Sequence, residues 1–134
     1  RVVESSPEDF ERRLQALRGY PVVVNVWGSW CGPCKYEFPF FQRASQRLGK
    51  RVAFLGINLV DSRSNAEEFL AERPLPYPSL EDGSARITRK AAPGTTGAPV
   101  TVFYDRRGER TYVHQGGYSD EQDLLDDIER YAGA

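Results

Sequence analysis

The segment Val22–Lys35 reads VVVNVWGSWCGPCK and contains both cysteines of the 134-residue chain, Cys31 and Cys34. The β-branched run at its start predicts a buried strand. A Gly-Ser turn follows, and a segment of helical character begins at the cysteine pair. Backbone N–H groups at a helix start are unpaired and carry partial positive charge, so a thiolate there is stabilised. We therefore predict that Cys31 is a nucleophile and that Cys34, one turn further in, is its resolving partner.

Two other interpretations of the C-x-x-C spacing remain open. A structural zinc site needs four nitrogen or sulfur ligands, and this chain has two cysteines and one histidine. Such a site would need Asp, Glu or a second chain to close. A purely structural disulfide is also possible, although so short a loop restricts the unfolded chain very little. The strand–turn–helix context favours redox chemistry over both.

The sequence around the cysteines resembles the thioredoxin superfamily. The hexapeptide WCGPCK at residues 30–35 resembles the thioredoxin active-site signature, and Pro39 falls where that family kinks its active-site helix. The heptapeptide GAPVTVF at residues 97–103 resembles the second hallmark, a cis-proline before a central strand. The resemblance covers about Pro7 to Tyr131. It implies an α/β thioredoxin fold, with a central mixed sheet flanked by helices on both faces.

Within the superfamily, the chain is more similar to the exported, membrane-tethered branch of TlpA, ResA and CcmG-like proteins. Asn25 replaces the buried Asp of cytosolic thioredoxin, and CKYEFP at residues 34–39 resembles the C-K-x-E-x-P pattern of the branch. The long stretch between Asn58 and Pro99 resembles its insertion between the second strand and the cis-proline. At the start, a helix over Pro7–Arg18 leads straight into the strand, which is more thioredoxin-like.

Length and charge set further limits. A chain of 134 residues is one domain, residues 1–134, and buries a real core. The chain has 18 Lys and Arg and 19 Asp and Glu, so it lacks the net positive charge that would attract nucleic acid or an anionic membrane. No apolar run approaches the roughly 18 residues of a membrane span. The chain begins at Arg1, so we expect a mature or trimmed form that lacks its targeting or anchoring segment. We expect a monomer.

Hydrophobic periodicity and turn residues predict the remaining elements. Gly19 and Gly49 end the first two helices, and Asp61 or Ser62 caps the third. Helices are expected at about residues 7–18, 31–48, 65–72, 82–90 and 119–131; strands at 22–27, 52–58, 100–104 and 110–114. The first two strands should be parallel and the last two an antiparallel hairpin. Arg73–Pro78, with three prolines, is expected as a semi-extended connector.

Several residues near the cysteines receive predicted roles. The resemblance implies a cis Ala98–Pro99 bond that packs Pro99 against the cysteines and leaves the Ala98 backbone free to pair with an extended substrate. An ordinary trans proline is the alternative. Gly32 and Pro33 set the redox poise, and Pro33 has no N–H to add to the thiolate. Gly-Pro at these positions is typical of the reducing end of the superfamily.

Attack by Cys34 also requires a proton acceptor. Asn25 cannot titrate, so the candidates are Asp61, just after the second strand, and Glu37 in the cysteine-bearing helix. The alternatives are a helix cap for Asp61 and a solvated helix position for Glu37.

The remaining predictions concern aromatic and basic residues. Trp30 is expected to cover the disulfide as an exposed apolar platform, and Trp27 to lie in the core. Lys35 either favours the thiolate by its charge or is a solvated helix residue. His114 is expected at the surface or half buried; a minority interpretation makes it a copper ligand together with the two cysteines.

These observations predict an enzyme: a thiol–disulfide oxidoreductase acting on protein thiols and disulfides, with no metal and no cofactor beyond the Cys31–Cys34 disulfide. The branch resemblance implies an extracytoplasmic location, a membrane electron-transfer partner and a reducing role, for example toward apocytochrome thiols before haem attachment. One alternative is an oxidase that introduces disulfides into exported proteins. Another, from a different class, is a copper metallochaperone.

Overall fold

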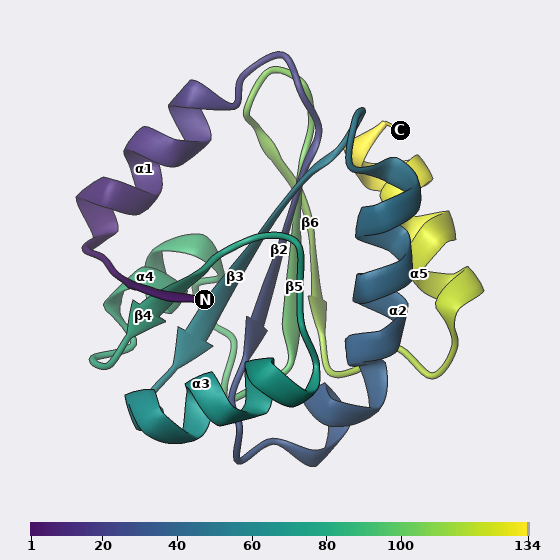
Figure 1. Cartoon of the computed structure of the whole chain (residues 1–134). Helices are drawn as coiled ribbons and strands as arrows, with labels where there is room; N and C mark the ends of the chain where they lie inside the picture. The colour runs from purple at the N-terminus through teal and green to yellow at the C-terminus, as the bar shows by residue number, and fades with distance from the viewer. Residues whose placement is uncertain (134) are drawn as a thin grey trace.

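The computed structural model describes residues 1–133, which form a six-stranded mixed sheet with helices on both faces (Figure 1). The strand order is β1-β4-β3-β2-β5-β6. The strands span β1 (Val2–Glu4), β2 (Val22–Trp27), β3 (Ala53–Leu59), β4 (Ser79–Asp82), β5 (Val100–Tyr104) and β6 (Arg110–Gln115). The pairs β1–β4, β4–β3 and β3–β2 are parallel, and the pairs β2–β5 and β5–β6 are antiparallel. The predicted mixed sheet and its hairpin are confirmed.

The central strand β2 is buried on both faces, because its side chains point alternately into the hydrophobic clusters on the two sides of the sheet. Val22, Val24 and Val26 pack in one cluster. Val23 packs in a second cluster on the other face, and Trp27 in a third. A strand covered on both sides needs an apolar sequence throughout, and this accounts for the valine run.

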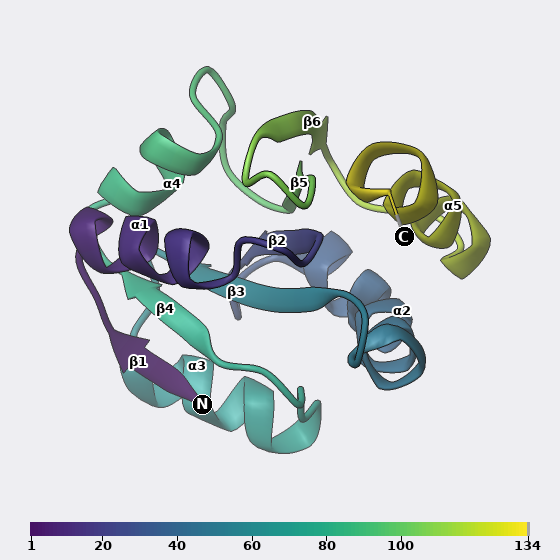
Figure 2. The ribbon, with the colours of Figure 1, turned by 90° about the horizontal axis from the view of Figure 1, so that it is seen from above.

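The helices divide between the two faces (Figure 2). Those of one face, α1 (Pro7–Ala16) and α4 (Arg86–Ala91), pack on the first cluster through Phe10, Ile87 and Ala91. The other face carries α2 (Gly32–Leu48), α3 (Arg63–Glu72) and α5 (Glu121–Asp127), which continues as a π-helical turn, Ile128–Ala132. Pro39 lies inside α2, and Gly49 caps its end.

Two strands were not predicted from the sequence. The short strand β1 pairs with β4, and β4 also pairs with β3. Asp82, expected at the start of a short helix, instead ends β4. Its carboxylate accepts hydrogen bonds from the backbone of Ile87 and Thr88, so it anchors the start of α4 from outside the helix. Between β3 and Pro99, the expected insertion region forms α3, β4 and α4.

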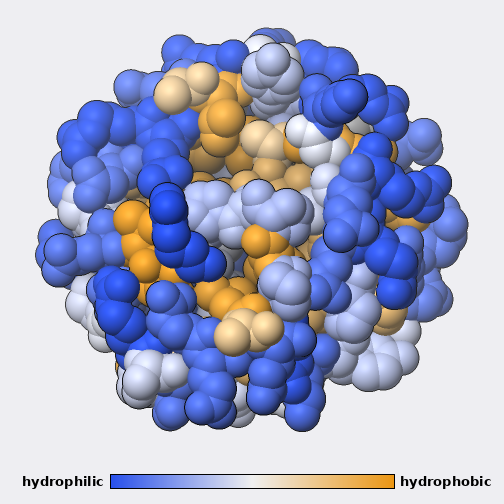
Figure 3. Space-filling model, viewed as in Figure 1, coloured by the Kyte–Doolittle hydropathy of each residue, from blue (hydrophilic) through white to orange (hydrophobic). Residues whose placement is uncertain are grey.

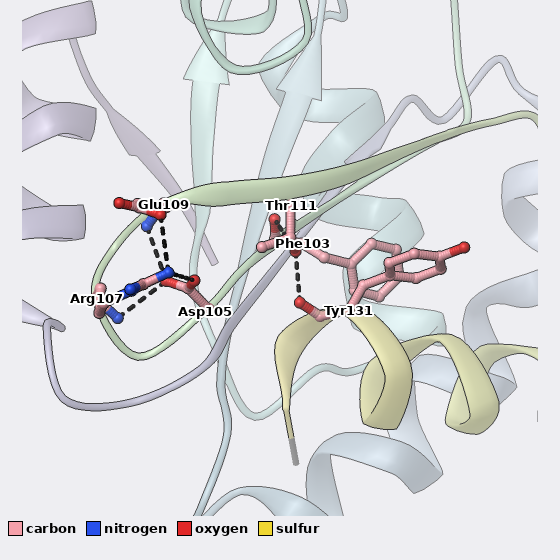
Figure 4. A network of polar contacts seen from close by, with 6 residues as sticks. All are labelled: Phe103, Asp105, Arg107, Glu109, Thr111 and Tyr131. Atoms are coloured by element: carbon pink, nitrogen blue, oxygen red, sulfur yellow. Dashed lines mark hydrogen bonds and ion pairs between the residues drawn. The ribbon is translucent and has the colours of Figure 1, made fainter.

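The β5–β6 turn is held by its own polar groups (Figure 4). Asp105 Oδ1 accepts from the backbone N–H groups of Arg107 and Glu109. These backbone bonds, Glu109 first, lower the pKa of the Asp105 carboxyl. Thr111 Oγ1 donates to the carbonyls of Phe103 and Tyr131, which ties the hairpin to the end of the last helix.

The face seen in Figure 1 is hollowed between α1 and the end of α2, where apolar side chains are visible (Figure 3). This hollow of about 480 Å³ is lined by Leu17, Phe54, Tyr77 and other residues, and lies at the end of α2 opposite the cysteines. No helix within residues 1–133 combines the length and the apolar character needed to cross a bilayer.

Candidate active site

The two cysteines form a disulfide at the beginning of α2. Cys31 is the N-cap residue, with extended backbone, and its Sγ accepts a hydrogen bond from the Cys34 backbone N–H over 3.2 Å. Cys31 is 5% exposed and Cys34 is fully buried. The less buried of the two cysteines is therefore the one at the positive end of the helix dipole, which is the geometry expected of an attacking thiolate.

The cis-proline turn at Ala98–Pro99 is the next element of the site. The Ala98–Pro99 bond is cis, as the resemblance implied. Ala98 packs against the hydrophobic cluster that contains both cysteines. A Cβ placed on Gly117 would lie 3.5 Å from Pro99 Cγ and 3.6 Å from Pro33 Cβ, so Pro33 and Pro99 share Gly117 as a neighbour.

Glu37 is the buried carboxylate of the site. It lies on α2 one turn after Cys34, and its side chain is fully buried. The Tyr118 backbone N–H donates to Oε1 over 3.0 Å, and Asn25 Nδ2 donates to Oε2 over 2.9 Å. Burial raises the pKa of Glu37 to about 7, and these two hydrogen bonds oppose the rise. The interpretation of Glu37 as a solvated helix residue is wrong, because the neighbouring loop covers it.

Asp61 holds the loop that leads into the cysteines. Its carboxylate accepts hydrogen bonds from the Ser29 backbone N–H and hydroxyl, each over 2.7 Å, and from Asn58 Nδ2 over 3.1 Å. It does not cap α3, because Ser62 does so by accepting from Asn65. Asp61 is thus fixed to the segment just before Cys31.

The two tryptophans differ in exposure as predicted, while a contact of Trp30 with the disulfide stays a prediction. Trp27 is fully buried and stacks on Phe69, whereas Trp30 is 53% exposed beside the disulfide turn. Trp30 Nε1 donates to the carbonyls of Leu59 and Val60. Gly28 makes room for this ring, since a Cβ there would lie 2.4 Å from Trp30 Nε1.

The exposed Lys35 borders a surface hollow of about 550 Å³, which Trp30 and Asp61 also line. Gly32 and Pro33 are exposed at the start of α2. The open face of the site is therefore made of Trp30, Gly32 and Pro33, with Lys35 at its edge.

His114 packs against the loop between β6 and α5. Its ring stacks on Tyr118 with the centroids 4.1 Å apart, and its Nδ1 is 4.0 Å from Asp127 Oδ2. Within the described residues, no group of three or more His, Cys, Asp or Glu side chains is arranged to hold a metal ion. The copper interpretation therefore has no third ligand beside the cysteines in this part of the chain.

Three contributors to the site were not predicted. Tyr118 and Gly117 reach the site from the loop between β6 and α5, and Ser29 binds Asp61. The adjacent glycines at 116 and 117 are the only local signal, because they predict a turn. Nothing in the sequence indicates that this turn covers Glu37.

The fold and the site define a thioredoxin-fold protein with a C-x-x-C disulfide at a helix N-terminus. The chain belongs to the Redoxin family, whose model matches residues 5–128. It is similar to the thiol:disulfide interchange protein DsbE of Yersinia pestis, with 34% identity over 119 residues, which is 86% of this chain and 61% of that protein. It is also similar to the thiol-disulfide oxidoreductase ResA of Geobacillus thermodenitrificans, with 30% identity over 120 residues, 89% of this chain and 68% of that protein.

Among solved structures, the chain resembles one described as a thiol:disulfide interchange protein DsbE from Chlorobium tepidum. The TM-score is 0.78 at 28% identity, over 88% of this chain and 84% of that one. These likenesses confirm the expected branch of the thioredoxin superfamily. The chain spans less than two thirds of the length of the DsbE relatives that it matches.

Proposed function

We propose that this protein is a thiol–disulfide oxidoreductase that exchanges disulfides with other proteins outside the cytoplasm. The observation that carries the proposal is the Cys31–Cys34 disulfide at the N-terminus of α2, with the less buried cysteine at the cap. A helix N-terminus stabilises the thiolate that must attack and later leave. The names of the relatives support the same class of activity.

In the reducing direction, the Cys31 thiolate attacks one sulfur of a substrate disulfide. A bond forms between Cys31 Sγ and that sulfur, the substrate disulfide breaks, and the other substrate sulfur leaves as a thiolate. Cys34 then loses its proton and attacks Cys31 Sγ. The enzyme disulfide forms, the second substrate sulfur leaves, and two electrons have passed from the enzyme to the substrate.

Of the two candidate proton acceptors for Cys34, we propose Glu37. It follows Cys34 by one helical turn, it is fully buried, and its pKa of about 7 suits proton exchange with a thiol near neutral pH. The carboxylate of Asp61 is engaged by Ser29 and Asn58. We assign Asp61 the role of holding the loop before Cys31.

The substrate would lie on the exposed surface around the disulfide. Trp30 offers an apolar platform, and Gly32 and Pro33 leave the start of α2 open. The backbone at Ala98, before Pro99, would pair with an extended substrate segment, as in strand addition. Such pairing uses the substrate backbone, so it would not depend on the side chains of the substrate segment.

We further propose the reducing direction, with a membrane electron-transfer partner that reduces the disulfide again. Gly32-Pro33 is typical of the reducing end of the superfamily. Apocytochrome thiols awaiting haem are the substrate that the branch resemblance implies. An oxidase that introduces disulfides is the competing candidate, and the redox potential separates the two.

The test combines trapping with a redox titration. The reduced Cys34→Ser variant should form a stable mixed disulfide with a protein disulfide substrate, and the Cys31→Ser variant should form none. Equilibration of the wild-type chain with glutathione should give a potential nearer to about −270 mV than to about −120 mV. Trapping through Cys34 would refute the assigned roles, and a potential near the upper value would favour the oxidase.

A further inference from the structure

Asn25 is a buried amide in the middle of a valine-rich strand. It lies on β2, is 2% exposed, and stands opposite Thr101 of β5 in the antiparallel register. Its Nδ2 donates to Glu37 Oε2 over 2.9 Å and to Thr101 Oγ1 over 3.4 Å. Asn25 is therefore the link between the sheet and the buried carboxylate of the site.

The oxygen of this amide, Asn25 Oδ1, accepts no hydrogen bond. Among the buried side-chain atoms of residues 1–133, Asn25 Oδ1 is the one nitrogen or oxygen without a hydrogen-bond partner. A buried acceptor without a donor lowers stability, and an apolar residue at this position would avoid that cost. Val23 and Trp27, which share a face of β2 with Asn25, are buried apolar residues, so this face accommodates apolar side chains. The presence of an amide here, despite its unpaired oxygen, therefore points to a role for Asn25 in the site.

The two protonation states of Glu37 need opposite partners. A carboxylate only accepts hydrogen bonds, whereas a carboxylic acid also has one hydrogen to donate. At Oε1 the partner is the Tyr118 backbone N–H, which can only donate. At Oε2 the partner is an amide, which carries donors on one end and an acceptor on the other.

We propose that Asn25 is the positioning residue for the proton of Glu37. Its Nδ2 donates to the Glu37 carboxylate. When the side-chain amide rotates by half a turn, Oδ1 takes the place of Nδ2 and accepts from the Glu37 carboxylic acid. The inference rests on the proposed function, in which Glu37 receives the proton of Cys34. In the inverted orientation, Oδ1 also faces the Thr101 hydroxyl, which can donate to it. The amide thus supports the carboxyl group before and after proton transfer.

The other groups around Glu37 cannot replace this amide. Cys34 is bonded to Cys31 in the oxidised protein, and the Tyr118 hydroxyl donates to Asp127 Oδ2 rather than to Glu37. Tyr77 lines the hollow at the other end of α2. Burial raises the pKa of both phenols, and for Tyr118 the hydrogen bond to Asp127 raises it further, so both phenols stay neutral. Burial raises the pKa of Glu37 and its two hydrogen bonds oppose the rise, with no contribution from a positive charge.

The first test follows the oxidised wild-type chain by NMR, since the disulfide form has no titrating thiol. The carbon-13 signal of the Glu37 carboxyl group reports its protonation on either side of pH about 7. Nuclear Overhauser contacts from the Asn25 Nδ2 hydrogens to Thr101 report the orientation of the amide. We expect these contacts above the titration and their loss below it. Contacts that persist through the whole titration would overturn the proposal.

A second test uses Asn25→Leu, which removes both ends of the amide. The carboxylate loses the stronger, charge-assisted bond, so the proton affinity of Glu37 should rise about tenfold, one pH unit. The matched control is Asn58→Leu, because Asn58 is also a buried strand amide but donates to Asp61; it should leave the Glu37 titration in place. An unchanged titration in Asn25→Leu would overturn the proposal.

Activity is measured separately on the same samples. A chain that exchanges disulfides while its Asn25 contacts ignore the titration would refute the role of Asn25 alone. A chain whose Asn25 contacts switch with Glu37, but which exchanges no disulfide, would refute the proposed function and support the amide inversion.

Discussion

The Glu37 carboxylate and the Tyr118 backbone N–H are joined by a buried hydrogen bond of 3.0 Å across 81 positions of the sequence. This bond fastens the loop between β6 and α5 over the start of α2. Gly117, one residue earlier, borders both Pro33 and Pro99. The loop therefore covers the Glu37 carboxylate and keeps water from it. This burial is the largest cause of the raised pKa of Glu37.

Glu37→Gln should remove a pH dependence from the exchange reaction. In the wild type, the rate of mixed-disulfide resolution should rise as pH passes through about 7, because only the carboxylate can take the Cys34 proton. The variant should lose this inflection and resolve the mixed disulfide on the order of 10²-fold more slowly. Stopped-flow kinetics over a pH series measure both effects. Glu129→Gln, at an exposed position, is the control and should keep the inflection.

Glu37 should also make stability depend on pH. Its folded pKa of about 7 exceeds the ordinary value of 4.5, so between these values the folded state holds a proton that the unfolded state has released. The contribution of the neutral acid is full below pH 4.5 and is lost as pH rises through about 7. The unfolding free energy should therefore fall by about 3 kcal/mol over this range, relative to Glu37→Gln. Urea unfolding of the two oxidised proteins at several pH values checks this, and parallel profiles would contradict it.

Asp61→Ala should loosen the segment before Cys31. The substitution leaves the Ser29 backbone N–H and the Asn58 amide without their acceptor, and we expect a loss of about 2–3 kcal/mol in unfolding free energy. Ser29→Ala removes only the hydroxyl bond and should cost about 1 kcal/mol. Urea unfolding compares the two. Equal losses would mean that the bonds from the Ser29 backbone N–H and the Asn58 amide contribute nothing to stability.

The same position separates the two proton-acceptor candidates. Asp61→Asn should leave the pH inflection of mixed-disulfide resolution near 7, because that inflection belongs to Glu37. Loss of the inflection in Asp61→Asn and its survival in Glu37→Gln would reverse the assignment. The stopped-flow series described for Glu37 measures both variants.

Ser79→Ala should destabilise the core below the site. Trp27 Nε1 donates to Ser79 Oγ over 2.9 Å, and both residues are fully buried. Removing the hydroxyl leaves the indole N–H without an acceptor, at a cost of about 1–3 kcal/mol. In a Trp27→Phe background the same change should cost less, because no indole N–H remains. Equal costs in both backgrounds would show that the bond is not responsible.

Local patterns in the sequence determined the central part of the fold. The valine run, the cysteine pair after a Gly-Ser turn and the alternating run after Pro99 predicted β2, α2 and β5 in place. Each depends on backbone preference or side-chain periodicity, which are properties of residues close together in the sequence. The order of the two cysteines at the helix start followed from the same local information.

Only the tertiary structure decided the edge strands and the chemistry around Glu37. Val2–Glu4 and Ser79–Asp82 are too short to show alternation, and they are strands because each finds a pairing partner. Glu37 looks like a solvated helix residue until Tyr118 covers it and Asn25 binds it. The pKa of a carboxyl depends on the groups packed around it in space, and here those groups come from chain segments far away in sequence.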